Sequence, residues 1–167
     1  MLTSDGLELE KFAVLWRDAM WEAVDPAERV RLVLELGRAT LREQGRVTPQ
    51  LVALVPSADP PVVVYDLPDV PSESHAPAVR QRAQLQLQEQ GAQEAIVMVM
   101  VKSGEHDGAA TFLLLAWGET SGGDESCWMS ALRQRGDEFE EAPPVRAPDP
   151  RQTELSRLCR GLLPRVH

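Results

Sequence analysis

The residues best suited to chemistry lie between Tyr65 and His75. Two carboxylates, Asp66 and Asp69, are followed closely by the imidazole of His75. Carboxylate oxygens and imidazole nitrogens are the side-chain ligands that divalent ions use in proteins. If the loop gathers these side chains, the chain is a small enzyme or a small-ligand or metal-binding protein.

A second interpretation of the same loop is structural. Aspartate and serine beside prolines are common turn formers and helix caps, and the spacing of Asp66, Asp69 and His75 matches no known metal-binding loop. We therefore expect no metal and no other cofactor there, and we keep the Tyr65–His75 loop as the alternative.

Other reactive side chains do not assemble into a catalytic motif. His106 and Asp107 fit the solvated tip of a hairpin, and Cys159 lies on the apolar stripe of a helix. The acidic residues near Cys127 would raise the pKa of its thiol, whereas a nucleophile needs a lowered pKa. We assign no catalytic residue, which leaves enzyme activity open and favours a non-catalytic role.

The composition of the chain excludes several functional classes. The chain has 167 residues and a net charge of -9, the wrong sign for a protein that neutralises nucleic-acid phosphates. Its apolar runs, around 95–101 and 111–117, are far shorter than the roughly 20 residues that span a bilayer. With no signal-like start and only two cysteines, we expect a cytoplasmic protein with reduced thiols, binding neither nucleic acid nor membrane.

The N-terminal part, 1–45, is expected to be helical. Apolar residues over 7–24 have helical spacing, and Asp25-Pro26 is typical of a helix start, with Gly45 as the stop. This second helix is apolar on two sides, with Leu32 and Leu36 on the second side. It must therefore be sandwiched between a sheet and the first helix, or between a sheet and a second subunit.

The remaining sequence predicts an antiparallel sheet. Short runs of β-branched residues, bounded by turn residues, indicate five strands. Their ranges are 51–55, 62–65, 94–102, 109–117 and 126–132. A helix over 76–90 interrupts them within the sheet part, 46–135, and an acidic, proline-rich linker, 136–150, leads to a short C-terminal helix over 151–162. We predict one α+β domain, 1–167, with about five strands and with helices mainly on one face of the sheet. Apolar residues at both parities of 94–102 and 109–117 indicate central strands buried on both faces, so the second face needs another helix or a partner.

The functional prediction is a protein-interaction module. Trp16 and Trp21 are five positions apart on the predicted helix, so their side chains point about 140° apart and cannot share one contact. Exposed tryptophan is a common interface anchor, so Trp21, with Leu32 and Leu36, is expected at a homodimer contact or at a protein partner. The predicted order of elements, with helices outside a five-stranded antiparallel sheet in a small acidic chain, broadly resembles that of bacterial secretion chaperones. This resemblance in element order implies a chaperone-like role in binding a partner protein.

Overall fold

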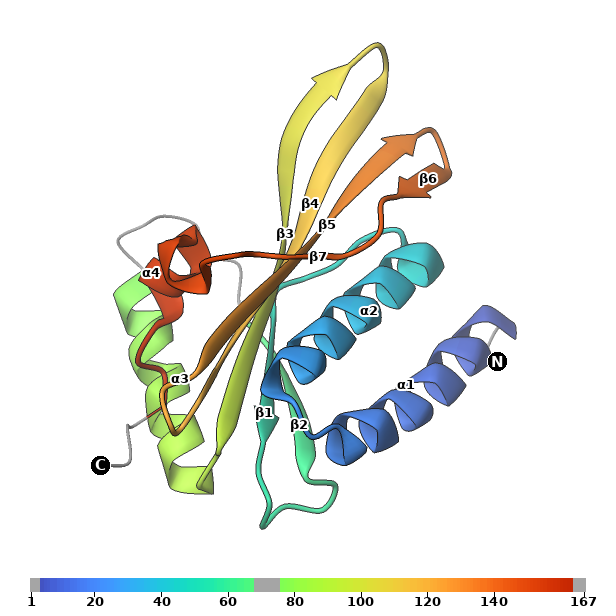
Figure 1. The fold of residues 1–167 in the computed structure, drawn as a ribbon. Coiled ribbons are helices and arrows are strands. Elements are labelled where there is room, and N and C mark those ends of the chain that lie inside the picture. The colour runs from blue at the N-terminus through green and yellow to red at the C-terminus, as the bar shows by residue number, and fades with distance from the viewer. Residues whose placement is uncertain (1–3, 68–75, 164–167) are drawn as a thin grey trace.

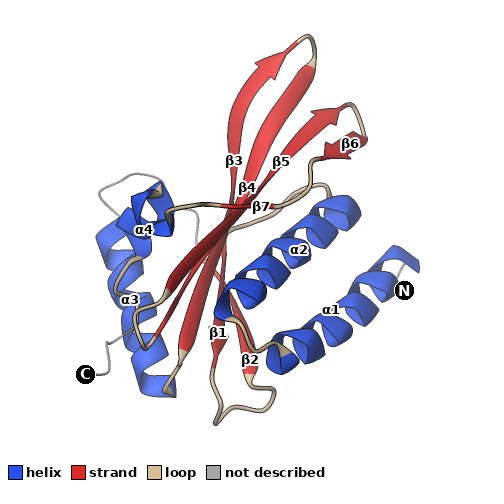
Figure 2. Ribbon diagram, viewed as in Figure 1, coloured by secondary structure: helices blue, strands red, loops and turns tan. Residues whose placement is uncertain are grey.

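A computed structural model describes residues 4–67 and 76–163 of the chain (Figure 1). It confirms the α+β class, with a curled antiparallel sheet and helices packed on it (Figure 2). The elements in chain order are α1 (Ser4–Glu22), α2 (Pro26–Gln44), β1 (Gln50–Leu54), β2 (Val62–Asp66), α3 (Ala76–Gln90), β3 (Glu94–His106), β4 (Ala109–Thr120), β5 (Glu125–Arg135), β6 (Glu138–Glu141), β7 (Val145–Arg146), the 3-10 turn η2 (Pro150–Gln152) and α4 (Glu154–Cys159). In the part of the chain described, no helix is long and apolar enough to cross a membrane.

Within residues 4–67 and 76–163 the sheet has seven strands, where the sequence predicted about five. Its order is β2-β1-β3-β4-β5-β6, and β7 pairs with β5 beside β6. Both additional strands lie in the segment 136–150, for which the sequence indicated a linker. Both strands are short and contain charged residues, and the three glutamates of β6 have little strand propensity, so pairing with the long β5 stabilises these strands.

Helices pack on both faces of the sheet, so the prediction of helices mainly on one face was wrong, while the prediction of central strands buried on both faces is confirmed. Figure 1 shows α1 and α2 on one side and α3 and α4 on the other. Alternate residues of the same strands supply the two cores: Ile96 and Met98 pack beneath α2, while Ala95 and Val97 pack with Leu87 of α3. The apolar residues at both parities of β3 are explained by this double covering.

The helix α2 begins and ends as its sequence predicts. The Asp25 side chain accepts a hydrogen bond from the Ala27 backbone N–H at 3.0 Å, Pro26 occupies the first turn, and Gly45 closes the helix in the left-handed conformation at φ 75°. At Gly37 the helix comes very close to the sheet. An added Cβ there would overlap Met98 Sδ and lie 3.0 Å from Leu114 Cδ2.

The other side of α2 is covered by α1. Trp16 is buried, and its indole N–H donates to the Leu32 carbonyl at 2.7 Å. Leu36 is buried and Leu32 is half-buried in the same core. Packing within one chain therefore satisfies the two-sided apolar pattern of α2, so that pattern by itself does not require a second subunit.

A buried ion pair joins α2 to the start of β3. Arg29 donates to both carboxylate oxygens of Glu94, with 2.5 Å from Nε to Oε2, and also to the Ala23 carbonyl beyond the end of α1. Both charged side chains are about nine-tenths buried. One guanidinium thus ties together the α1–α2 connection, α2 and the sheet.

We expect Gly37→Leu to destabilise the fold by about 3 kcal/mol or more. Overpacking forces a shift of the helix or of Met98 and Leu114, and such shifts cost about 1–3 kcal/mol even for smaller changes. Chemical denaturation followed by circular dichroism measures the loss. Glu43→Leu, at an exposed position of the same helix, serves as control and should leave the stability nearly unchanged; an equal loss in both variants would contradict the close packing.

Arg29→Met should cost about 3–5 kcal/mol, because it leaves the Glu94 carboxylate buried without its partner. Arg31→Met removes the more exposed pairs with Glu28 and Glu35, and should cost less than about 1 kcal/mol. Urea unfolding of both variants provides the comparison. If the two variants lost similar free energies of unfolding, burial of the Arg29–Glu94 pair would not add to its contribution to stability.

Candidate interaction surface

The far half of the sheet, on the α3 and α4 side, carries an uncovered apolar surface. In Figure 1 the ends of β3 and β4 extend past the helices. We call this area the far sheet face. It consists of two rows of side chains that run across the strands. The first row is Val99, Leu115, Met129 and Val145, and the second is Val101, Leu113 and Ala131. They share a face with Trp117 and Cys127, which lie in the core formed with Leu155 of α4.

Exposure rises along this face with distance from α4. Val99, Leu115 and Met129 are half-buried against the core that contains Trp117. Val101 is 46 % exposed and Val145 is 60 % exposed, which is high for valines within strands. Contiguous apolar side chains left open in this way are typical of interaction sites.

Charged side chains continue the same face toward the hairpin ends. Arg133 and Arg135 of β5 stand opposite Glu140 and Glu138 of β6 in the sheet register. All four residues are exposed, and in the described parts of the chain none of them takes part in an ion pair. Their charges are available to a partner.

Only Tyr65, Asp66 and Leu67 of the Tyr65–His75 loop belong to the described residues. Asp66 is the exposed last residue of β2, and its carboxylate accepts from Gln50 Nε2 at 3.3 Å. The Tyr65 hydroxyl donates to the side-chain oxygen of Gln90 at the end of α3. Asp69 and His75 lie outside the described residues, so the structure does not test whether they meet Asp66; over 4–67 and 76–163 no group of three His, Cys, Asp or Glu side chains could hold a metal.

The hairpin between β3 and β4 turns more tightly than the sequence suggested. β3 continues to His106, and Asp107 and Gly108 alone form the turn, with φ of 53° and 76°. Positive φ at both positions is typical of the type I′ turn, for which Asp-Gly is a preferred pair. His106 and Asp107 thus serve at the exposed end of a hairpin, as predicted for a solvated tip.

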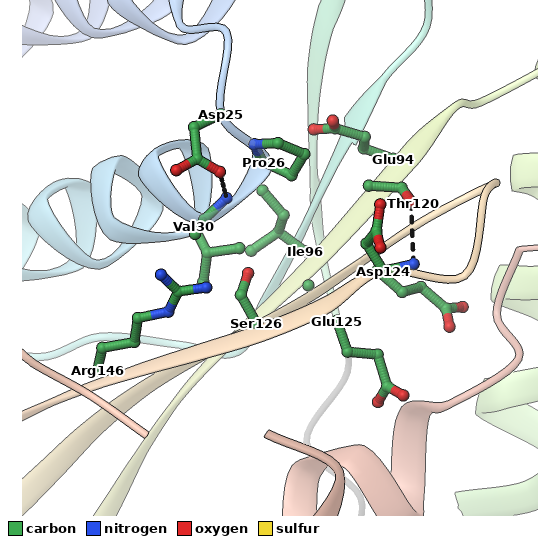
Figure 3. Close-up of a pocket in the computed structure, with 13 residues that line it drawn as sticks. Asp25, Pro26, Val30, Glu94, Ile96, Thr120, Asp124, Glu125, Ser126 and Arg146 are labelled. Atoms are coloured by element: carbon green, nitrogen blue, oxygen red, sulfur yellow. Dashed lines mark hydrogen bonds between the residues drawn. The ribbon is translucent and has the colours of Figure 1, made fainter. Parts of the chain in front are cut away.

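A cavity of about 210 Å³ lies at the beginning of α2 (Figure 3). Ile96, Gly118 and Ser126 of the sheet line it beneath Val30. Two of its carboxylates already have structural partners: Asp25 caps α2 and Glu94 binds Arg29.

A third carboxylate of that cavity, Glu125, serves the opposite face of the sheet. In Figure 3 the Glu125 side chain points away from Val30 and toward α4. It accepts from the Ser156 hydroxyl at 2.6 Å and forms ion pairs with Arg151 and Arg160. These contacts hold α4 on the sheet.

Both cysteines are free thiols in protected places. Cys127 is buried in the core under α4, and Cys159 is partly buried at the end of that helix. Burial raises the pKa of each thiol to about 11; a hydrogen bond with Thr153 offsets this in part for Cys127, and the charge of Arg80 does so for Cys159. Neither thiol is activated as a nucleophile at neutral pH.

The predicted contact residues occupy different environments. Trp21 is 51 % exposed on the outer side of α1, whereas Leu36 is buried and Leu32 half-buried beneath that helix. The far sheet face was not singled out from the sequence, although apolar residues at both parities over 96–101 and 112–117 indicated strands covered on both sides. The signal was present, but which half of each strand a helix would cover depends on where α3 and α4 lie.

Comparisons with protein-family models, with curated proteins and with solved structures find no match.

We expect both thiols to react slowly with a disulfide reagent at pH 7. A pKa about two units above the usual value leaves about 100-fold less thiolate, and burial slows the reagent further. The labelling rate should rise about tenfold per pH unit until pH approaches 11. Denatured protein gives the rate of the unprotected thiols, Cys159→Ser assigns the two phases, and one fast native cysteine at pH 7 would contradict the assignment.

Proposed function

We propose that this protein is a non-catalytic, dimeric protein-interaction module that binds an amphipathic helix of a partner protein on its far sheet face, in the manner of a chaperone. The observation that carries the proposal is the pair of open apolar rows on β3, β4, β5 and β7, with Val101 and Val145 the most exposed. Burying these side chains removes apolar surface from water, and this is the main driving force of protein association.

A helix is the partner segment that suits this surface. The near half of the same sheet face is already covered by helices of this chain: Leu87 of α3 and Leu155 of α4 pack on it. A further helix laid on Val101, Leu113 and Met129 would continue the same layer of helices on the sheet. Arg133 and Glu140 at the end of the rows favour a partner helix that carries both signs of charge.

The chemistry of the remaining residues supports a non-catalytic role. The carboxylates of Glu94, Glu119 and Glu125 are used in structural contacts, and burial disfavours the thiolates of both cysteines. In the described part of the alternative Tyr65–His75 loop, Tyr65 and Asp66 form hydrogen bonds with Gln90 and Gln50, which are structural contacts. Free thiols suit the reducing cytoplasm, where we propose that the protein acts.

The proposal predicts binding of a designed helical peptide. The probe has a leucine stripe, alternating Glu and Lys on its polar side, and a fluorescent label. Anisotropy should show micromolar binding, and amide NMR shifts should map to β3, β4 and β5. Val101→Glu places a charge under the helix and should weaken binding at least tenfold, about 1.4 kcal/mol.

Leu85→Glu is the matched control, since Leu85 is a comparably exposed apolar residue on α3 and lies outside the two rows. Its affinity for the peptide should equal that of the unmodified protein. The proposal would be wrong if a scrambled peptide of identical composition bound equally well, if the NMR shifts mapped to another surface, or if no binding occurred up to about 1 mM peptide.

A further inference from the structure

A cavity of about 430 Å³ lies between the two N-terminal helices and the sheet. This volume is within the roughly 300–1,000 Å³ that is typical of small-molecule sites. Ala13 and Arg17 of α1 line it one helical turn apart, as do Thr40 and Gln44 of α2, so each helix presents one flank to the same space. The short side chains of Ala13 and Thr40 leave that space open.

The sheet supplies the opposite wall of this cavity. Gln50 of β1 and Asp66 of β2 stand directly opposite one another in the register, and Val64 lies on the same face of β2, two positions before Asp66. Val64 is half-buried, and with Trp16 and Leu36 it makes an apolar floor. The cavity thus combines an apolar floor with polar residues around it.

Three charged groups around the cavity are left without an ion pair. Arg17, Arg46 and Asp66 all line it, and all three are exposed. In the described parts of the chain none of them forms an ion pair, either with one another or with a further residue. Two positive groups and one negative group are therefore available to a bound molecule.

One wall of the cavity also lacks a hydrogen-bond donor. Gln50 Nε2 donates to the Asp66 carboxylate at 3.3 Å, which fixes the orientation of the amide. Gln50 Oε1 is buried and has no partner among the described residues, and a buried acceptor without a donor is unfavourable. A ligand N–H that enters beside the amide satisfies this oxygen after a small rotation of the Gln50 side chain.

We propose that this cavity binds a zwitterionic amino acid with a large apolar side chain. The ligand carboxylate pairs with Arg17 and Arg46, whose planar guanidinium groups suit the geometry of a carboxylate. The ligand ammonium group donates to the Asp66 carboxylate and to Gln50 Oε1. The apolar side chain lies on the floor of the cavity, where its burial removes apolar surface from water.

A zwitterion suits this cavity better than a simple anion or a simple amine. The chain has a net charge of -9, which repels free anions, and a simple anion would also leave Asp66 without a partner. A simple amine would leave both arginines without a partner. Gln44 is the last residue of α2, and the partial negative charge at a helix C-terminus adds to the attraction for the ammonium group.

This inference goes beyond the proposed function and does not depend on it, because α1 and α2 lie on the opposite side of the sheet from the far sheet face (Figure 1). Isothermal titration calorimetry with L-phenylalanine tests it. We expect one site with a dissociation constant between about 10 μM and 1 mM, since both arginines stay partly in solvent. 3-Phenylpropionate lacks the ammonium group and phenethylamine lacks the carboxylate, so each should bind about tenfold more weakly or worse.

Variants of the lining residues assign the roles. Arg17→Gln and Arg46→Gln should each weaken L-phenylalanine binding by about fivefold or more. Asp66→Asn removes the partner of the ammonium group alone, so it should weaken binding of L-phenylalanine but not of 3-phenylpropionate. Ala13→Phe fills the cavity from α1 and should abolish binding. Arg82→Gln is the matched control, because Arg82 is exposed on α3, on the other side of the sheet, and it should bind as the unmodified protein does.

Circular dichroism should show the same helix content in all variants. The inference is overturned if the unmodified protein binds no L-phenylalanine up to about 10 mM, or if 3-phenylpropionate or phenethylamine binds as tightly as the amino acid. It is also overturned if the folded Arg17→Gln, Arg46→Gln or Ala13→Phe variant keeps full affinity, or if amide NMR shifts caused by L-phenylalanine map away from Gln50 and Val64.

Discussion

The structure depends on how closely α2 approaches the sheet. Gly37 on the helix and Gly118 on β4 have no side chain, and a Cβ on either residue would press on its neighbours: Met98 and Leu114 for Gly37, Val30 for Gly118. Because interiors are packed about as densely as organic crystals, a helix seated this closely has only one well-packed position. The Arg29–Glu94 ion pair then holds the beginning of the helix against β3.

The position of α2 determines which surfaces remain open. Because α2 covers one sheet face, α1 packs on the outside of α2, and its own outer stripe with Val14 and Trp21 faces solvent. On the opposite face, Glu125 holds α4 near Trp117, so the distant ends of β3, β4 and β5 stay uncovered. Both exposed apolar surfaces thus follow from where the helices pack.

The polar chemistry of the chain is used largely for architecture. Glu119 accepts hydrogen bonds from the backbone of Gly161 and Leu163, and Glu141 binds Arg38 and Arg42 between β6 and α2. Burial by itself would raise the pKa of Glu141, but the hydrogen bonds and charges of Arg42 and Arg38 lower it below its usual range. The stabilisation by Glu141 is therefore present at neutral pH and is lost as pH falls through that lowered pKa. Glu119 and Glu141 therefore connect structural elements to one another.

The sequence by itself determined the elements whose signals are local. Asp25-Pro26 and Gly45 define α2, helical spacing defines α1, and β-branched runs define the central strands, because caps, periodicity and turn residues act within a few positions. Only the tertiary structure decided that 138–141 and 145–146 become strands, since their pairing partner on β5 supplies the stabilisation. It also decided that Leu36 is buried while Trp21 is exposed, and that one half of the sheet face is open. Those outcomes depend on which elements meet in space, and local residue patterns carry no information about distant partners.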